Sequence, residues 1–299
     1  MKNVHPTHAH PVAVLDAGHY GPNYNKGAAS GYYESARMWE LTNLQADLMR
    51  SIGIEVILTR SNRDKDQELT QRGRMARDAD IFESLHSNAC NVPTVDRPVG
   101  IYLVDDDCGP IDEQSREFAR LMAQAVRDCM DTNDPANIIF RKSDRDRDGD
   151  GLKNDDYYGV LYGAHQVGTP AIIMEHSFHT NPRMAEWMMS DANLQKLALA
   201  KTAAYAEWFG LPVEVIASAP AEARDDDLAG SYRVTAVRLN VRDGAGTDHE
   251  ILTDIPEDTI VRNYGYYTPV NGTRWLYVRF KQAGIVYVGF CSEKYLERV

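Results

Sequence analysis

The chain has 299 residues, of which 43% are hydrophobic and 25% are charged, an ordinary composition for a globular protein. Its formal net charge of -12 argues against a nucleic-acid partner, because backbone binding depends on Lys and Arg neutralising phosphates. No apolar run approaches the roughly 20 residues that cross a bilayer, so we expect no membrane partner either.

Over the first 210 residues, short apolar runs alternate with helical patterns. We expect strands at 12–16, 54–59, 81–85, 99–104 and 171–175, and helices at 34–51, 68–78, 112–130, 157–167 and 191–209. In the first helix, Met38, Leu41, Leu44 and Leu48 recur at three- and four-residue steps, and Gly53 follows its end. The alternation predicts an α/β domain over 11–210, with a mixed sheet flanked by helices.

A second part of the chain begins after a change of composition. Residues 211–230 are rich in Ala, Pro and acidic groups, which predicts a linker. Short alternating runs broken by Gly, Asn and Pro follow, and they predict a small all-β barrel over 231–299. This segment holds nine Lys and Arg against eight Asp and Glu, whereas the preceding 230 residues hold 23 against 36.

Three residues with metal-binding or acid-base side chains lie at the ends of predicted strands. His19 and His86 directly follow apolar runs, and Glu175 closes the run Ala-Ile-Ile-Met. In an open α/β sheet, ligands bind in the crevice at the carboxyl ends of the strands. We therefore expect these residues to form one site.

Two imidazoles and a carboxylate, from His19, His86 and Glu34, are donors that zinc prefers, and a catalytic zinc site uses three protein ligands. Each residue also has a simpler interpretation. A Glu in a first helical turn is favoured by the helix dipole, and a His after a strand is often a hydrogen-bonded loop residue. The residues alone leave both interpretations open.

The wider pattern resembles the zinc-dependent N-acetylmuramoyl-L-alanine amidases over about residues 11–210. The segments that carry the resemblance are Leu15-Asp16-Ala17-Gly18-His19, Glu34, Leu58-Thr59-Arg60, Ser84-Leu85-His86-Ser87-Asn88-Ala89 and Met174-Glu175-His176-Ser177-Phe178-His179-Thr180-Asn181. The chain departs from the family at Ala17, where Pro is usual, and at Tyr20, where Gly is common.

The resemblance implies that His19, Glu34 and His86 bind one Zn²⁺ and that Glu175 is the catalytic acid/base. It favours Glu34 over Glu40 as the carboxylate ligand, because Glu34 has the family spacing. It also implies the substrate, the amide between N-acetylmuramic acid and L-alanine in peptidoglycan. His176 and His179 either support the metal site or lie in a surface loop; we expect the loop for His179 and leave His176 open.

A second candidate metal site lies in the segment that precedes the predicted helix at 157–167. Asp144, Asp146 and Asp148, followed by Gly149 and by Asp155 at the twelfth position, have the oxygen-ligand spacing of a Ca²⁺ loop. The twelfth residue is Asp instead of the usual Glu. A solvated acidic loop is the alternative interpretation.

The C-terminal segment resembles a bacterial SH3-type domain over about 231–299. The resemblance is carried by Leu239-Asn240-Val241-Arg242, Ile255-Pro256, Trp275-Leu276-Tyr277-Val278 and Tyr287-Val288-Gly289-Phe290. It implies binding to the bacterial cell wall. Tyr264, Tyr266 and Tyr267 either stack on a ligand or belong to the core of the barrel.

These observations together predict a two-domain peptidoglycan hydrolase that needs no obligate protein partner. The alternatives are a zinc peptidase acting on cell-wall peptides and a catalytically inactive wall-binding protein. The N-terminal residues lack the apolar core of a signal peptide. We therefore expect an endolysin-like enzyme released by phage or mother-cell lysis, or a secreted autolysin whose leader has been removed.

Overall fold

The computed structural model describes residues 10–104, 109–211 and 215–299. The chain divides into two compact units, Met1–Ser190 with Lys196–Leu211, and Asp191–Gln195 with Pro212–Val299. Within the described ranges, none of the helices is both long and apolar enough to cross a bilayer.

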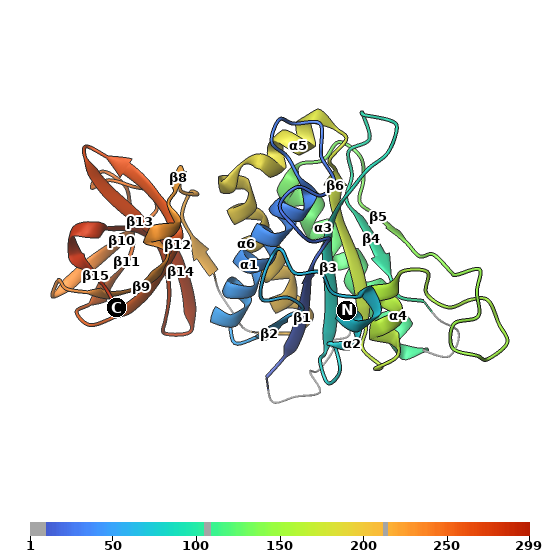
Figure 1. Ribbon diagram of the computed structural model, residues 1–299. Coiled ribbons are helices and arrows are strands. Elements are labelled where there is room, and N and C mark those ends of the chain that lie inside the picture. The colour runs from blue at the N-terminus through green and yellow to red at the C-terminus, as the bar shows by residue number, and fades with distance from the viewer. Residues whose placement is uncertain (1–9, 105–108, 212–214) are drawn as a thin grey trace. The chain divides into compact units, whose positions relative to one another are not determined.

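The first unit contains a six-stranded mixed sheet (Figure 1). Its strands, in spatial order, are β2 (Glu55–Leu58), β1 (Val12–Ala17), β3 (Ile81–Asn88), β6 (Ala171–Phe178), β4 (Val99–Tyr102) and β5 (Asn137–Ile139). The first four run parallel, β4 is antiparallel to β6, and β5 is parallel to β4. Because β1, β3 and β6 are parallel neighbours, their carboxyl ends meet at one edge of the sheet.

Helices cover both faces of this sheet, as the sequence predicted (Figure 1). The two faces are covered by α1 (Glu34–Ser51), α3 (Pro110–Met130) and α6 (Asp191–Trp208) on one side, and by α2 (Leu69–Arg74) and α4 (Gly159–His165) on the other. Residues two apart on a strand share a face. Val14, Phe82 and Ile173 therefore pack with Val160 and Leu161 of α4 in one buried core. Each such side chain contributes about 1.5–3 kcal/mol when it is fully buried.

Two short elements were not predicted. The strand β5 has three residues, too few for a periodic pattern. The helix α5 (Pro182–Met189) follows soon after β6. Its N-terminus has a sequence signal that could have predicted it: the Asn181 side chain caps the helix by accepting a hydrogen bond from the Met184 N–H, and Pro182 occupies the first turn.

The second unit is an all-β domain, as predicted. Its nine-stranded sheet is antiparallel except where β7 pairs with β14. The strands are β7 (Val215–Ala217), β8 (Ala223–Arg224), β9 (Gly230–Val234), β10 (Arg238–Arg242), β11 (Ile251–Pro256), β12 (Ile260–Val270), β13 (Thr273–Gln282), β14 (Ile285–Ser292) and β15 (Leu296–Arg298). Tyr266 is 2% exposed, which supports the core interpretation for that residue.

The predicted linker differs from the structure over most of its length. Residues 212–214 lie outside the described ranges, but β7 pairs with β14 and β8 pairs with β12. Leu228 is buried in the core of the second unit. Backbone pairing and one well-placed Leu outweigh the polar composition on which the prediction rested, so this segment is part of the β domain.

Candidate active site

Three of the predicted site residues come from adjacent strands. His19 follows β1 by two residues, His86 lies in β3, and Glu175 lies in β6 as the direct pairing partner of His86. The pairing between β3 and β6 shifts register just after His86. Such irregularities are common beside functional sites, where they change the direction of a side chain. The structure brings these three residues together at one edge of the sheet, where they line the same pocket.

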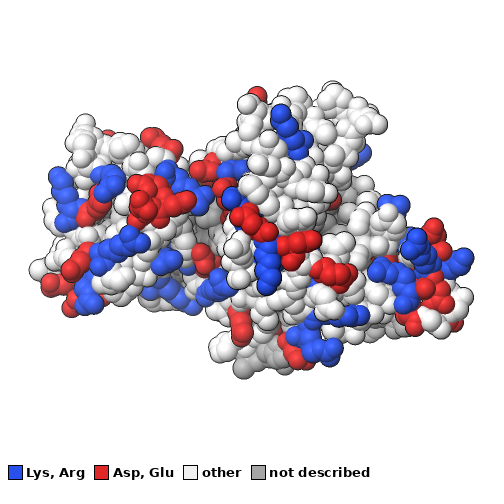
Figure 2. Space-filling model, viewed as in Figure 1, with Lys and Arg blue, Asp and Glu red and all other residues white. Residues whose placement is uncertain are grey.

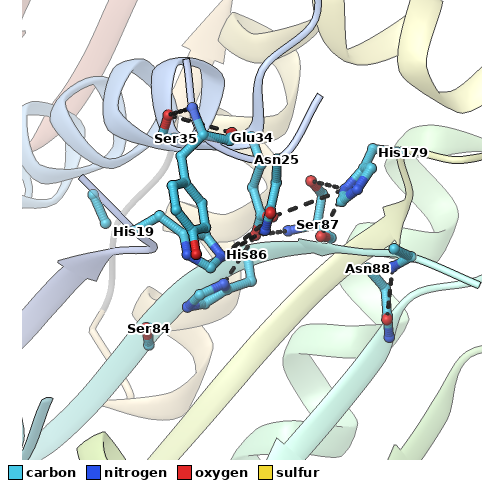
Figure 3. Close-up of polar contacts among 12 residues, drawn as sticks. His19, Asn25, Glu34, Ser35, Ser84, His86, Ser87, Asn88 and His179 are labelled. Atoms are coloured by element: carbon cyan, nitrogen blue, oxygen red, sulfur yellow. Dashed lines mark hydrogen bonds and ion pairs between the residues drawn. The ribbon is translucent and has the colours of Figure 1, made fainter. Parts of the chain in front are cut away.

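The fourth residue, Glu34, is the first residue of α1 and is 1% exposed. Its Oε1 atom lies 2.9 Å from Nδ1 of His86, and its Oε2 atom lies 3.3 Å from Nε2 of His19. The Asn25 side chain donates a hydrogen bond of 2.7 Å to the same Oε2. Figure 3 shows His19, Asn25 and His86 converging on Glu34 from three segments of the chain.

One ligand atom each from His19, Glu34 and His86 can be chosen so that all three lie within 4.8 Å of one another, close enough to hold a metal ion. Two imidazole nitrogens and a carboxylate oxygen are a donor set typical of catalytic zinc. Burial alone would raise the pKa of Glu34, but hydrogen bonds and charge from the two histidines outweigh it and lower that pKa. The carboxylate is therefore ionised, as a metal ligand must be.

Glu175 lies in a different environment. It lines a pocket of about 330 Å³ together with both histidines, Tyr158 and apolar side chains of α2 and α4. Burial, opposed in part by His86 and reinforced by the charge of Glu34, raises its pKa to about 7. Its Oε2 atom has no hydrogen-bond partner among the described residues. A pKa near neutrality suits a group that both accepts and donates a proton.

The comparisons with known proteins bear on this site. A family model described as N-acetylmuramoyl-L-alanine amidase matches residues 13–206, more than half of the chain. The chain belongs to this amidase family. No curated protein sequence matches it.

Solved structures of amidases share the fold of the first unit. The catalytic domain of CwlV from Bacillus (Paenibacillus) polymyxa var. colistinus is 19% identical, with a TM-score of 0.52 over 67% of this chain and 99% of that one. The amidase from Clostridium difficile 630 is 20% identical, with a TM-score of 0.54 over 68% of this chain and 98% of that one. AmiC2 of Nostoc punctiforme is 18% identical, with a TM-score of 0.53 over 67% of this chain and 97% of that one.

In this amidase-family site, Glu34 and not Glu40 reaches the histidines. Glu40 lies six residues further along α1 and pairs with Arg37. The Arg37 guanidinium also donates to the backbone carbonyls of Met188 and Met189. The structure thus agrees with the family spacing that favoured Glu34.

The backbone around His19 and His86 in the amidase unit is closely fitted. A Cβ atom at Gly18 would lie 2.6 Å from ring atoms of His86 and 2.7 Å from the Leu85 carbonyl oxygen, so only glycine fits there. His19 has a φ of 58°, in the left-handed region that few residues other than glycine adopt. Strain of this kind persists where the surrounding structure fixes the backbone, often at functional sites.

Buried polar groups hold the end of β1 in place. The carboxylate of Asp16 is fully buried and accepts hydrogen bonds from Thr59, Ser84 and Arg72, of 2.6, 2.7 and 3.1 Å. Arg72 also donates to the Ala17 carbonyl oxygen. Since Ala17 is two residues before His19, these bonds orient the segment that carries that imidazole.

His179 was expected in a surface loop, and this prediction is wrong. Its side chain is buried, and its Nδ1 lies 2.9 Å from the Ser87 hydroxyl and 3.9 Å from Oε2 of Glu34. His179 directly follows β6. Its carbonyl oxygen accepts a hydrogen bond from the Ala28 N–H, so the chain after β6 lies against the segment that precedes α1. Ser87 and Asn25 were not assigned to the site from sequence, although Ser87 lies in a segment that carries the family resemblance.

His176, which the sequence left open, is buried beneath the site. Its Nδ1 lies 2.8 Å from the His86 carbonyl oxygen, and its Nε2 lies 2.8 Å from Nζ of Lys201. Lys201 forms a fully buried ion pair of 2.8 Å with Glu83, which also accepts from Tyr205 and Gln45. Burial and the charge of Lys201 lower the pKa of His176, so the imidazole is neutral. This network supports the backbone of His86 from the opposite face of the sheet.

Proposed function

We propose that the chain hydrolyses the amide bond between the lactyl group of N-acetylmuramic acid and L-alanine in peptidoglycan. Membership of the amidase family supports this reaction. The observation that carries the proposal is the convergence of His19, Glu34 and His86 beside a pocket that also contains Glu175. A carboxyl group whose pKa lies near 7, next to a group of metal ligands, is the arrangement that amide hydrolysis by water requires.

His19, Glu34 and His86 would hold one Zn²⁺, and this donor set fits it. When bound, zinc would act as a Lewis acid that polarises the amide carbonyl and lowers the pKa of water. Glu175 accepts a proton from the attacking water at its unpaired Oε2 and then donates it to the departing L-alanine nitrogen. Glu175 lies on the strand next to His86, and both residues line the pocket.

The walls of the pocket fit the groups that flank the bond. Leu69, Val160 and Ile173 contribute apolar side chains to its lining. The lactyl group and L-alanine each carry one methyl group, and apolar walls favour both methyl groups while reducing the access of water. Tyr158 lies at the same pocket, so its ring contributes to the wall.

The metal requirement is tested by zinc content. We expect one zinc per chain in the purified protein, and loss of both zinc and wall lysis in the variant His86→Ala. His165→Ala is the matched control, because His165 lies in α4 outside the ligand group. Full lysis by the His86→Ala protein without zinc would contradict the proposal.

We also propose that the second unit is an SH3-type wall-binding domain. A groove of about 340 Å³ on it is lined by Arg238, Arg242, Trp275 and Tyr295. Aromatic and Arg side chains at a groove are typical of binding surfaces. Because the amidase unit is acidic, a second contact with the wall would raise the effective substrate concentration. This account places the enzyme at the cell wall, after lysis or secretion.

Sedimentation with insoluble peptidoglycan tests the groove in the full chain made inactive by Glu175→Gln. The added change Tyr295→Ala should reduce the bound fraction, because Tyr295 is 48% exposed at the groove. Ile251→Ala, at a residue 53% exposed on β11, is the control. Equal binding by both variants would count against the groove.

A further inference from the structure

The loop between β5 and α4 brings three acidic side chains together. Carboxylate oxygens of Asp146, Asp148 and Asp155 lie within 4.8 Å of one another. Asp144, the first position of the sequence-based alignment, is not part of this group. Figure 2 shows acidic and basic side chains side by side over the part of the first unit that this loop forms in Figure 1.

Among the described residues, no Lys, Arg or His side chain forms an ion pair with these three carboxylates. The hydrogen bonds that the three carboxylates accept come from backbone N–H groups, those of Gly149 and Gly151 on Asp146, Asp150 on Asp148, and Arg147 on Asp155. The guanidinium of Arg147 is directed elsewhere. It lies 3.9 Å from the centre of the Tyr162 ring and donates to the Asp156 carbonyl oxygen.

Asp155 provides a separate observation. It is 1% exposed, and its Oδ1 atom has no hydrogen-bond partner among the described residues. A buried carboxylate oxygen without a donor or cation is costly, because burial removes its hydration and nothing replaces it. An ion bound by the group would satisfy this oxygen.

The spacing in the folded loop agrees with a cation site. Starting from Asp146, oxygen side chains occur at positions 1, 3 and 5, and Gly151 occupies position 6 with a φ of 92°. A sharp turn at a glycine in position 6 is a feature of Ca²⁺ loops. Gly149, at position 6 counted from Asp144, has the same φ of 92°, and Asp155 is the tenth position counted from Asp146. The three carboxylates therefore share only the first part of the Ca²⁺-loop pattern.

We propose that this loop binds one Ca²⁺ through the carboxylates of Asp146, Asp148 and Asp155. Calcium suits the group because it accepts several carboxylate ligands in irregular geometry, whereas Mg²⁺ demands near-ideal octahedral geometry. Three residues after Asp155, Tyr158 lines the pocket that contains His86 and Glu175. Bound calcium restricts the motion of the loop that precedes Tyr158 in this wall of the pocket.

Isothermal titration calorimetry tests the site in the full-length, zinc-saturated protein after removal of other divalent ions. Titration with CaCl₂ should show one binding event, and MgCl₂ should bind much more weakly. Asp148→Asn, at an exposed position that tolerates substitution, should weaken calcium binding by about tenfold or more, because it removes one ligand charge. Asp144→Asn, the same change in the same loop, should leave the affinity within about twofold.

Thermal unfolding gives a second measurement. Calcium should raise the Tm of the native protein and of Asp144→Asn, and it should have a much smaller effect on Asp148→Asn. Absence of calcium binding at millimolar concentration would overturn the proposal, as would equal binding by Asp148→Asn and the native protein. Neither measurement depends on amidase activity, so this proposal can fail while the proposed reaction stands.

Discussion

Glu175 should make the zinc-free protein less stable at high pH, because its carboxylate is held where ionisation is costly. Burial raises the pKa of Glu175 to about 7, from an ordinary value of 4.5 in the unfolded chain. Below pH 4.5 the group is protonated in both states and costs nothing. Between pH 4.5 and about 7 the carboxyl group ionises in the unfolded chain but not in the folded one. The free energy of unfolding therefore falls as the pH rises, until the group also ionises in the folded protein near pH 7.

The magnitude follows from the two pKa values. At about 1.4 kcal/mol per pKa unit, the difference between about 7 and 4.5 corresponds to about 3 kcal/mol lost above pH 7. Glu175→Gln keeps the size of the side chain and removes the charge. The zinc-free variant should therefore be about 2–3 kcal/mol more stable than the native protein at pH 8 and nearly equal to it at pH 4.

Urea unfolding at pH 4, 6 and 8, followed by the fluorescence of the zinc-free protein, measures this difference. Glu117→Gln, which removes an exposed carboxylate on α3, is the control and should change little at any pH. Saturation with zinc should abolish the gain of Glu175→Gln, because a nearby cation favours the ionised carboxylate. A Glu175→Gln protein that is no more stable than the native one at pH 8 would refute the reasoning.

Two further substitutions test how the site is supported. Gly18→Ala should lower zinc affinity by about tenfold or more in a competition titration, since its Cβ would lie 2.6 Å from the His86 ring, and an unchanged zinc affinity would contradict this account. Lys201→Met should destabilise the protein by about 3–5 kcal/mol in urea unfolding, because it leaves Glu83 charged and buried. Adding Glu83→Leu should recover most of that loss, and a Lys201→Met protein of native stability would contradict this account of the pair.

The fold of the first unit could be predicted because its signals are local. The apolar runs that became β1, β3 and β6 are short and bounded, and the periodic pattern of α1 predicted its limits, Glu34–Ser51, to the residue. β5 escaped prediction because three residues carry no periodicity. The segment 215–230 was expected to be a linker because its strands gain stability from pairing with distant residues, which composition does not report.

The site was predictable in its position and only partly in its membership. Strand ends placed His19, His86 and Glu175 at one edge, since parallel strands require it. The choice of Glu34 over Glu40 came from family spacing, and the structure agrees. The burial of His179 could not be inferred, because it depends on how the chain after β6 turns back toward the segment before α1.

The bond that is broken tests the central claim most directly. Purified peptidoglycan digested by the native protein should be separated and identified by mass spectrometry, with the Glu175→Gln protein as the blank. We expect free stem peptides with new N-terminal L-alanine and glycan strands without peptides, and no new reducing sugar ends. Products cut within the peptide would indicate a zinc peptidase. Such products, or an absence of cleavage by the zinc-loaded native protein, would contradict the proposal that this chain hydrolyses the N-acetylmuramic acid–L-alanine amide.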